Sequence, residues 1–150
     1  MSNRAAARKS ADVVKSVRVE PQESTAYLMK ARQFVEESRA GAAAGRADAA
    51  MLCAIHAAIS AADAVTVALA GLRSTDSNHL AAAELLRVAG RGAGEFETRA
   101  RQFSALLQKK NLVEYEARNA NVAEVDDAVK RAERLVEWAS AEIEKALGGS

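Results

Sequence analysis

The sequence predicts an all-α fold, a bundle of four to five antiparallel helices. Alanine fills 36 of the 150 positions, and aromatic residues make up only 4% of the chain. Residues that favour strands, the β-branched and aromatic types, are few outside short patches. Apolar residues recur at steps of three and four along several long segments, which is the period of an α-helix. An all-β or parallel-sheet fold is therefore not expected.

The first 23 residues are predicted to form a flexible basic arm, followed by one helical domain over 24–147. Residues 1–20 contain five lysine or arginine residues against two acidic residues, a net charge of +3, whereas the whole chain carries +1. The segment has no apolar core of the kind found in signal peptides, which favours an arm over a targeting segment. Pro21 ends the arm in this interpretation.

Helical spacing of apolar residues places five helices in the domain. The first begins at Ser24 or Thr25, either of which can cap it, and ends near Gly41. The others cover about 46–70, 80–88, 95–109 and 122–147. Residues 72–78 are predicted to be a polar loop, and the helical pattern breaks across 110–121.

Cysteine and histidine usage excludes two classes of protein. Cys53 is the only cysteine, so no intrachain disulfide can form. The only histidines are His56 and His79, and no Cys/His cluster has the spacing of zinc ligands. No metal or other cofactor is predicted.

The longest apolar segment, residues 47–71, is predicted to be a buried helix rather than a membrane span. Five polar residues interrupt it, among them Asp48, His56 and Asp63. We therefore expect a cytoplasmic protein.

Three polar residues share one side of this second helix. His56, Ser60 and Asp63 lie at positions i, i+4 and i+7, so they project in similar directions. They are a candidate polar site, although one straight helix rarely provides the geometry of a catalytic triad, and no oxyanion hole is evident. The alternative is that His56 and Ser60 are hydrogen-bonded core residues and that Asp63 pairs with a cation on another helix.

A second candidate site follows the fourth helix, where the helical pattern breaks. Its members are Lys109, Lys110, Asn111, Tyr115 and Arg118. Cations bind phosphate and a tyrosine ring stacks on a base, so the cluster has the residue types of a small RNA-contacting patch. The alternative is a solvated helix end, at which the two lysines complement the helix dipole.

The order of several segments along the chain is similar to that of a known family. These segments are 27–34, 54–64, the short helix opened by His79, 107–116, and a last helix with alanines at Ala128, Ala132 and Ala139. Together they cover about 24–147 and resemble a bacterial HEPN domain. The resemblance implies a small helical bundle that forms homodimers and either cuts or binds RNA, often beside a nucleotidyltransferase-type antitoxin partner.

The resemblance also implies which residues form the site. Active members carry an arginine, a polar residue and, about four to six positions after the arginine, a histidine, and the matching positions here are Lys110, Asn111 and Tyr115. If the protein is active, these three residues are catalytic. The residues implied to bind substrate are Ser60, Asp63, Lys109 and Arg118. The motif is degenerate, because lysine lacks the forked grip of a guanidinium and a phenol is a poorer general base at neutral pH than an imidazole.

The resemblance leaves three functional hypotheses open. The first is an RNA-binding or partner-binding module with a degenerate ribonuclease motif. The second is a metal-independent ribonuclease toxin of a toxin–antitoxin pair, in which Lys110 stabilises phosphate charge and Tyr115 transfers a proton. The third is a purely structural interaction protein. Since a buried carboxylate needs a cation or donors, Asp63 is expected to lie close to Lys110 or Asn111.

Overall fold

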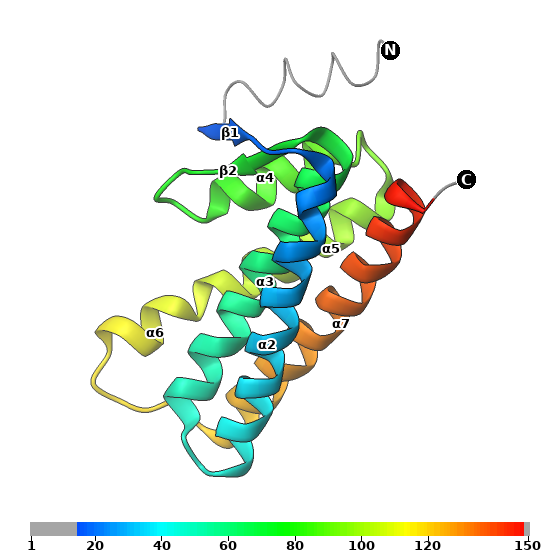
Figure 1. The fold of residues 1–150 in the computed structure, drawn as a ribbon. Coiled ribbons are helices and arrows are strands. Elements are labelled where there is room, and N and C mark those ends of the chain that lie inside the picture. The colour runs from blue at the N-terminus through cyan, green and yellow to red at the C-terminus, as the bar shows by residue number, and fades with distance from the viewer. Residues whose placement is uncertain (1–14, 149–150) are drawn as a thin grey trace.

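The computed structural model describes residues 15–148 and confirms the all-α fold class (Figure 1). Five helices have ten residues or more: α2 (Ser24–Ala43), α3 (Ala47–Ala70), α4 (Leu80–Ala89), α5 (Gly94–Gln108) and α7 (Val122–Leu147). The shorter elements are β1 (Ser16–Arg18), the 3₁₀ helix η1 (Pro21–Glu23), β2 (Leu72–Ser74) and α6 (Lys110–Tyr115). The predicted bundle is therefore correct, and α7 has the predicted bounds. The predicted break across 110–121 is wrong for residues 110–115, which form α6.

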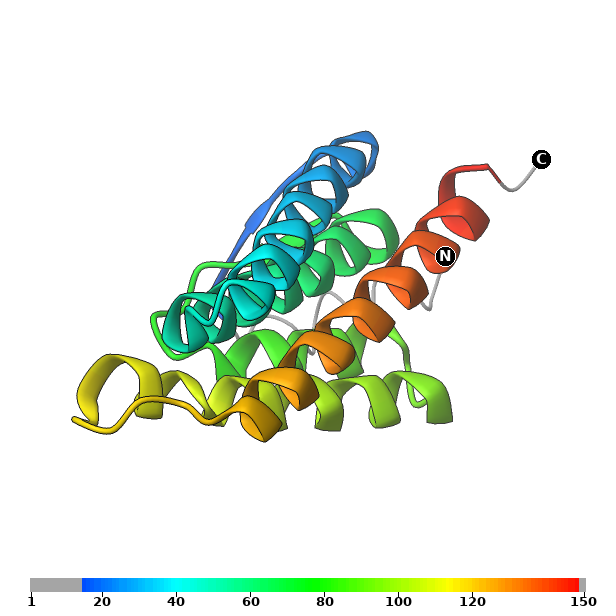
Figure 2. The same cartoon turned by 90° about the horizontal axis from the view of Figure 1, so that it is seen from below.

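α3 is the central helix of the bundle. It packs along α2 and α7 and also contacts α4, α5 and α6. In Figure 1, α2 runs in the opposite direction to α3 and α7, and Figure 2 shows α5 and α6 on the side of α3 opposite to α2. Nine of the fourteen buried residues of α3 are alanine, and such small side chains let helices approach closely. A Cβ added to Gly41 of α2 would lie only 3.2 Å from the Cβ of Ala50.

The length and hydropathy of α3 would also suit a membrane span, but the helix is mostly buried inside the fold. A helix that is apolar on all sides is expected at the centre of a protein as well as in a membrane. The burial agrees with the predicted buried helix and with a soluble protein.

A two-stranded antiparallel sheet departs from the predicted organisation. The register is Ser16↔Ser74, Val17↔Arg73 and Arg18↔Leu72. β2 falls within the predicted loop 72–78, so that prediction is wrong for residues 72–74. β1 falls within the predicted arm 1–23, and its pairing with β2 joins residues 16–18 of the arm to the domain. Residues 1–14 of the arm lie outside the described part of the chain. Neither strand has a local signal, because each is stabilised by a partner far away in the sequence.

The beginnings of two helices are fixed in different ways. The predicted cap of α2 is wrong: η1 runs directly into the helix, Glu23 takes the cap position without a side-chain hydrogen bond, and Ser24 is fully buried. α7 begins with a capping box, in which the Asn121 side chain accepts from the backbone N–H of Glu124 and the Glu124 carboxylate accepts from the backbone N–H of Asn121. This reciprocal pair explains why the start of α7 follows from the sequence.

Candidate functional site

A cavity of about 390 Å³ opens between the turn that precedes α4 and the α5–α6 segment. Both segments lie on the same side of the molecule in Figure 1. The lining residues are Ser77, Asn78, His79, Leu80, Leu107, Gln108, Lys110, Asn111, Glu114 and Tyr115. The cavity therefore brings together Lys110, Asn111 and Tyr115, the three residues implied to be catalytic, and adds His79 from a distant part of the chain.

The short helix α6 supplies most of the polar groups of the cavity. Lys109 is the single residue between α5 and α6, and α6 then places Lys110 and Glu114 one helical turn apart. The Lys110 Nζ lies 3.2 Å from Glu114 Oε1, and each side chain is about 30% exposed. Asn111 is exposed, and Tyr115 is 77% exposed. An ammonium, an amide and an aromatic ring thus face solvent from one short helix.

The two histidines share the electrostatic surroundings of this helix. Burial lowers the pKa of His56, and the charge of Lys110 lowers it further, while Glu114 acts in the opposite direction. Burial also lowers the pKa of His79, and the charges of Lys110 and His56 lower it further. The His56 ring additionally stacks on Phe34, with the ring centroids 5.4 Å apart. Burial and the charge of Lys110 therefore both favour the neutral form of the two imidazoles.

The cations that act on Asp63 are other residues than Lys110. Burial raises the pKa of its carboxyl to about 7, and the charges that offset this effect belong to Arg73 and Lys30, not to Lys110. Asp63 lies seven residues after His56, which is roughly 10 Å along the helix axis. Lys110 instead lowers the pKa of His56, two turns earlier on α3.

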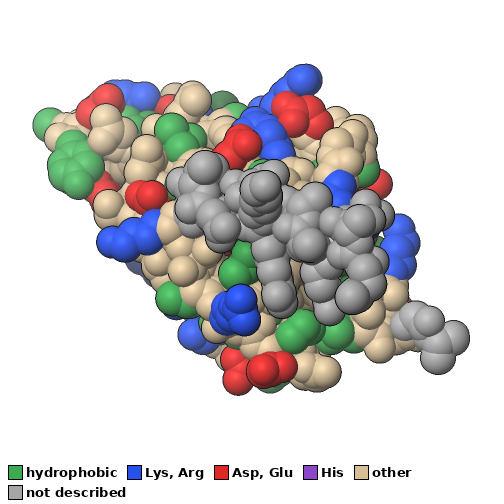
Figure 3. All heavy atoms as spheres, turned by 90° about the horizontal axis from the view of Figure 1, so that it is seen from above, with side chains coloured by type: hydrophobic (Ala, Val, Ile, Leu, Met, Phe, Trp, Pro, Cys, Tyr) green, Lys and Arg blue, Asp and Glu red, His purple; other side chains and the backbone are tan. Residues whose placement is uncertain are grey.

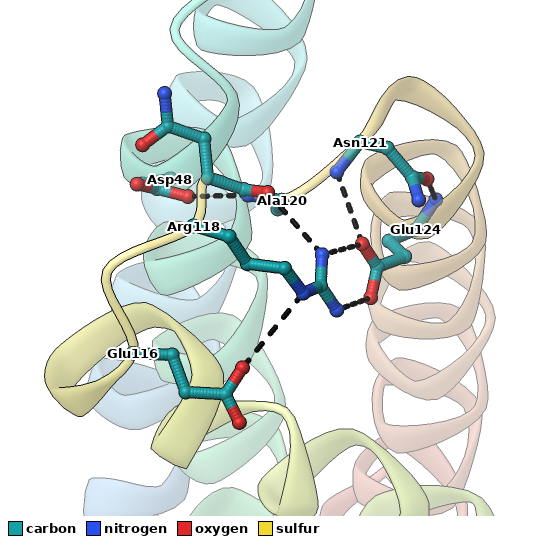
Figure 4. A network of polar contacts seen from close by, with 7 residues as sticks. Asp48, Glu116, Arg118, Ala120, Asn121 and Glu124 are labelled. Carbon is teal, nitrogen blue, oxygen red and sulfur yellow. Dashed lines mark hydrogen bonds and ion pairs between the residues drawn. The ribbon is translucent and has the colours of Figure 1, made fainter.

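Arg118 belongs to a polar network at the start of α7, which Figure 4 shows. Its two terminal nitrogens lie 2.8 and 3.0 Å from the two carboxylate oxygens of Glu124, and its Nε lies 3.8 Å from Glu116. The hydrogen bond from Arg118, together with that from the backbone N–H of Asn121, lowers the pKa of Glu124 to about 2. Nearby, Asp48 accepts a 2.8 Å hydrogen bond from the backbone N–H of Ala120. Arg118 therefore holds the link between α6 and α7.

The residues implied to bind substrate do not gather around the cavity. Ser60 and Asp63 lie on α3, and Lys109 and Arg118 flank α6, but none of the four lines the cavity. His79 and Glu114, to which no role was assigned from the sequence, do line it. The one signal for His79 is its rarity, since the chain contains only two histidines.

Comparisons with known proteins leave the site to be interpreted from its chemistry. No family model matches the chain, and no curated protein matches it. Within residues 15–148, no group of three or more histidine, cysteine or acidic side chains is arranged to hold a metal ion. The fold and site define a helical-bundle protein with one polar cavity beside α6 that contains a cation, an amide, an imidazole and an exposed aromatic ring.

Proposed function

We propose that this protein is a cytoplasmic RNA-binding module and that the cavity beside α6 receives a single-stranded segment. The observation that carries the proposal is the meeting of Lys110, Asn111 and Tyr115 around one open cavity. In this arrangement the ammonium contacts phosphate, the amide hydrogen-bonds a base edge or ribose, and the exposed ring stacks on a base. The cavity volume of about 390 Å³ falls within the range of ligand pockets, roughly 300–1,000 Å³.

The ion pair between Lys110 and Glu114 affects how strongly a phosphate can bind in the cavity. Its ammonium lies 3.2 Å from Glu114, so a phosphate has to compete with that carboxylate for the same cation. Both side chains are partly exposed, and a pair of this kind contributes little to stability. The ammonium is therefore available to an anionic ligand, and Glu114 weakens binding of any phosphate that lacks further contacts.

A protein partner is the second candidate, and two exposed side chains favour it. Tyr115 is 77% exposed and Leu80 is 47% exposed, and both line the cavity. Aromatic and aliphatic side chains of this kind are typical anchors of protein interfaces. The two candidates differ in their salt dependence, because RNA binding weakens steeply as salt rises.

RNA binding is tested by fluorescence anisotropy with a labelled, unstructured oligoribonucleotide over a series of salt concentrations. Lys110→Ala is expected to weaken binding about tenfold and to reduce the slope of log Kd against log salt by about 1, as the loss of one phosphate contact does. The matched control is Lys130→Ala, which removes an exposed lysine of α7 away from the cavity and leaves binding unchanged. If the unaltered protein binds no RNA at low salt, or if both variants behave alike, the proposed function is wrong.

A further inference from the structure

Glu114 is the one acidic residue among the described residues that line the cavity. Its Oε1 lies 3.2 Å from the Lys110 Nζ, and about 30% of each side chain is exposed. Within residues 15–148, the Glu114 side chain has no other ion pair or hydrogen bond. A phosphate that takes the ammonium therefore leaves a mostly buried carboxylate without a partner, which costs binding free energy. The ligand that binds best brings N–H donors for Glu114 as well as a phosphate for Lys110.

The two oxygens of the Glu114 carboxylate accept two parallel N–H bonds from a group of matching shape. Among the four RNA bases, guanine alone presents two adjacent N–H donors on its Watson–Crick edge, from N1 and from the N2 amino group. Adenine and cytosine present one amino group beside an acceptor nitrogen, and uracil presents one N–H between two carbonyl oxygens. These acceptors would face a carboxylate oxygen and repel it. The carboxylate of Glu114 therefore favours guanine over the other three bases.

Asn78 supplies a second preference for guanine from the turn before α4. Its side-chain Oδ1 accepts from the backbone N–H of Leu80 at 3.1 Å, which fixes the end of the amide that faces the backbone. The Nδ2 amino group, with two donors, is the end left for a ligand, and Asn78 lines the cavity. An amino group donates to O6 of guanine, whereas adenine has an amino group of its own at the corresponding position. Asn78 and Glu114 therefore favour the same base.

We propose that Glu114 is a specificity-determining residue that selects an unpaired guanine, by accepting from its N1–H and its N2 amino group. This inference rests on the proposed RNA binding. Lys110 contacts a phosphate of the same strand, Asn78 donates to O6, and the ring of Tyr115, 77% exposed, stacks on a base. The ion pair of the free protein is thus exchanged for contacts with the RNA, and neither charge is left without a partner.

The test measures fluorescence anisotropy of the full chain with four labelled oligouridine strands that differ at one central position. That position carries guanine, hypoxanthine, adenine or uracil, and hypoxanthine is guanine without the N2 amino group. We expect the guanine strand to bind about 30-fold more tightly than the adenine or uracil strand, as a bidentate pair provides. The hypoxanthine strand is expected to bind about fivefold more weakly than the guanine strand, because one hydrogen bond is lost.

Glu114→Gln keeps the shape of the side chain but replaces one acceptor oxygen by an amino group. We expect the guanine preference of this variant to fall to about threefold, because two adjacent N–H donors no longer find two acceptors. The uracil strand is expected to bind about threefold more tightly than to the unaltered protein, because no carboxylate competes with phosphate for Lys110. A side chain with only a structural role would not move the two affinities in opposite directions. The matched control is Glu137→Gln, a change at an exposed residue of α7 outside the cavity lining, and it leaves all four affinities unchanged.

The outcomes separate this inference from the proposed function. If none of the four strands binds at low salt, the proposed function is wrong and the role of Glu114 falls with it. If all four bind equally, or if Glu114→Gln keeps the full preference for guanine, RNA binding stands and the role of Glu114 is overturned. A hypoxanthine strand that binds as tightly as the guanine strand also overturns it, and this comparison uses only the unaltered protein.

Discussion

The carboxyl group of Asp63 is held in surroundings that disfavour its charge. It lies on the central helix α3, and burial raises its pKa from 3.8 to about 7, against the opposing charges of Arg73 and Lys30. The fold therefore binds a proton at Asp63 that the unfolded chain has already released between these two pH values. It follows that the contribution of Asp63 to the free energy of unfolding is greatest below about pH 4 and is lost as the pH rises through about 7.

Asp63→Asn removes this titration while keeping the shape of the side chain. We expect the variant to be more stable than the unaltered protein at pH 8, by roughly 1–3 kcal/mol, and to show no such gain near pH 4. Urea unfolding at a series of pH values measures the difference. A gain that is equal at both pH values would show that titration of Asp63 is not its cause, and a loss at pH 8 would show that Asp63 is stabilised in its charged form by Arg73 or Lys30.

At the scale of elements, α6 is the helix of the cavity that is held by the fewest contacts with the rest of the fold. It contacts α3 and α5, and its one buried residue is Leu112. The chain then reaches α7 through residues 116–121, which Arg118 and Glu124 hold in place (Figure 4). The ion pair therefore holds the link and the start of α7, and Arg118 does not line the cavity.

Arg118→Ala is expected to lower the melting temperature by a few degrees at pH 7 and to leave the affinity for RNA nearly unchanged. The pairing lowers the pKa of Glu124 from 4.5 to about 2, so its contribution to stability is full above about pH 4.5 and is lost as the pH falls through about 2. Arg134→Ala, a change at an exposed arginine of α7, controls for the loss of one positive charge. Should Arg118→Ala weaken RNA binding as much as Lys110→Ala, Arg118 contacts the ligand after all, as the resemblance implied.

At the scale of the whole molecule, the surface charge is mixed. In the visible part of the face shown in Figure 3, basic and acidic side chains are interspersed. The chain as a whole carries only +1. Selective binding of an anion therefore depends on local geometry at the cavity rather than on a general positive potential.

We expect the protein to form a homodimer. A bundle with 36 alanines and few aromatic residues buries limited apolar area for its length, and a second copy would cover further apolar surface. The exposed side chains of Leu80 and Tyr115 provide apolar surface beside the cavity that a second copy would cover. In such a dimer, two Lys109–Lys110 pairs would share one cleft. Light scattering at micromolar concentration should give a mass of about 32 kDa, twice that of one chain, and a mass of 15.9 kDa would exclude the dimer.

Local patterns of the sequence were sufficient for most of the helices. The steps of three and four give the amphipathic helices directly, and Asn121 and Glu124 mark the start of α7 because a capping box is formed by residues three positions apart. Lys110, Asn111 and Tyr115 are close together because they lie within six residues, but the helical pattern was predicted to break across 110–121, so the helix α6 that carries them was missed.

Tertiary packing alone decided the remaining features. β1 and β2 are stable only as a pair, and their partners lie more than fifty residues apart in the sequence. His79 and Lys110, 31 residues apart in the sequence, line the same cavity, and the charges that act on Asp63 belong to Arg73 and Lys30. The sequence by itself thus determined the five longer helices and the identity of the polar residues at 110–115. Contacts between distant segments determined the sheet, the composition of the cavity and the pKa shifts of His56 and His79, because burial and neighbouring charge exist only in the folded chain.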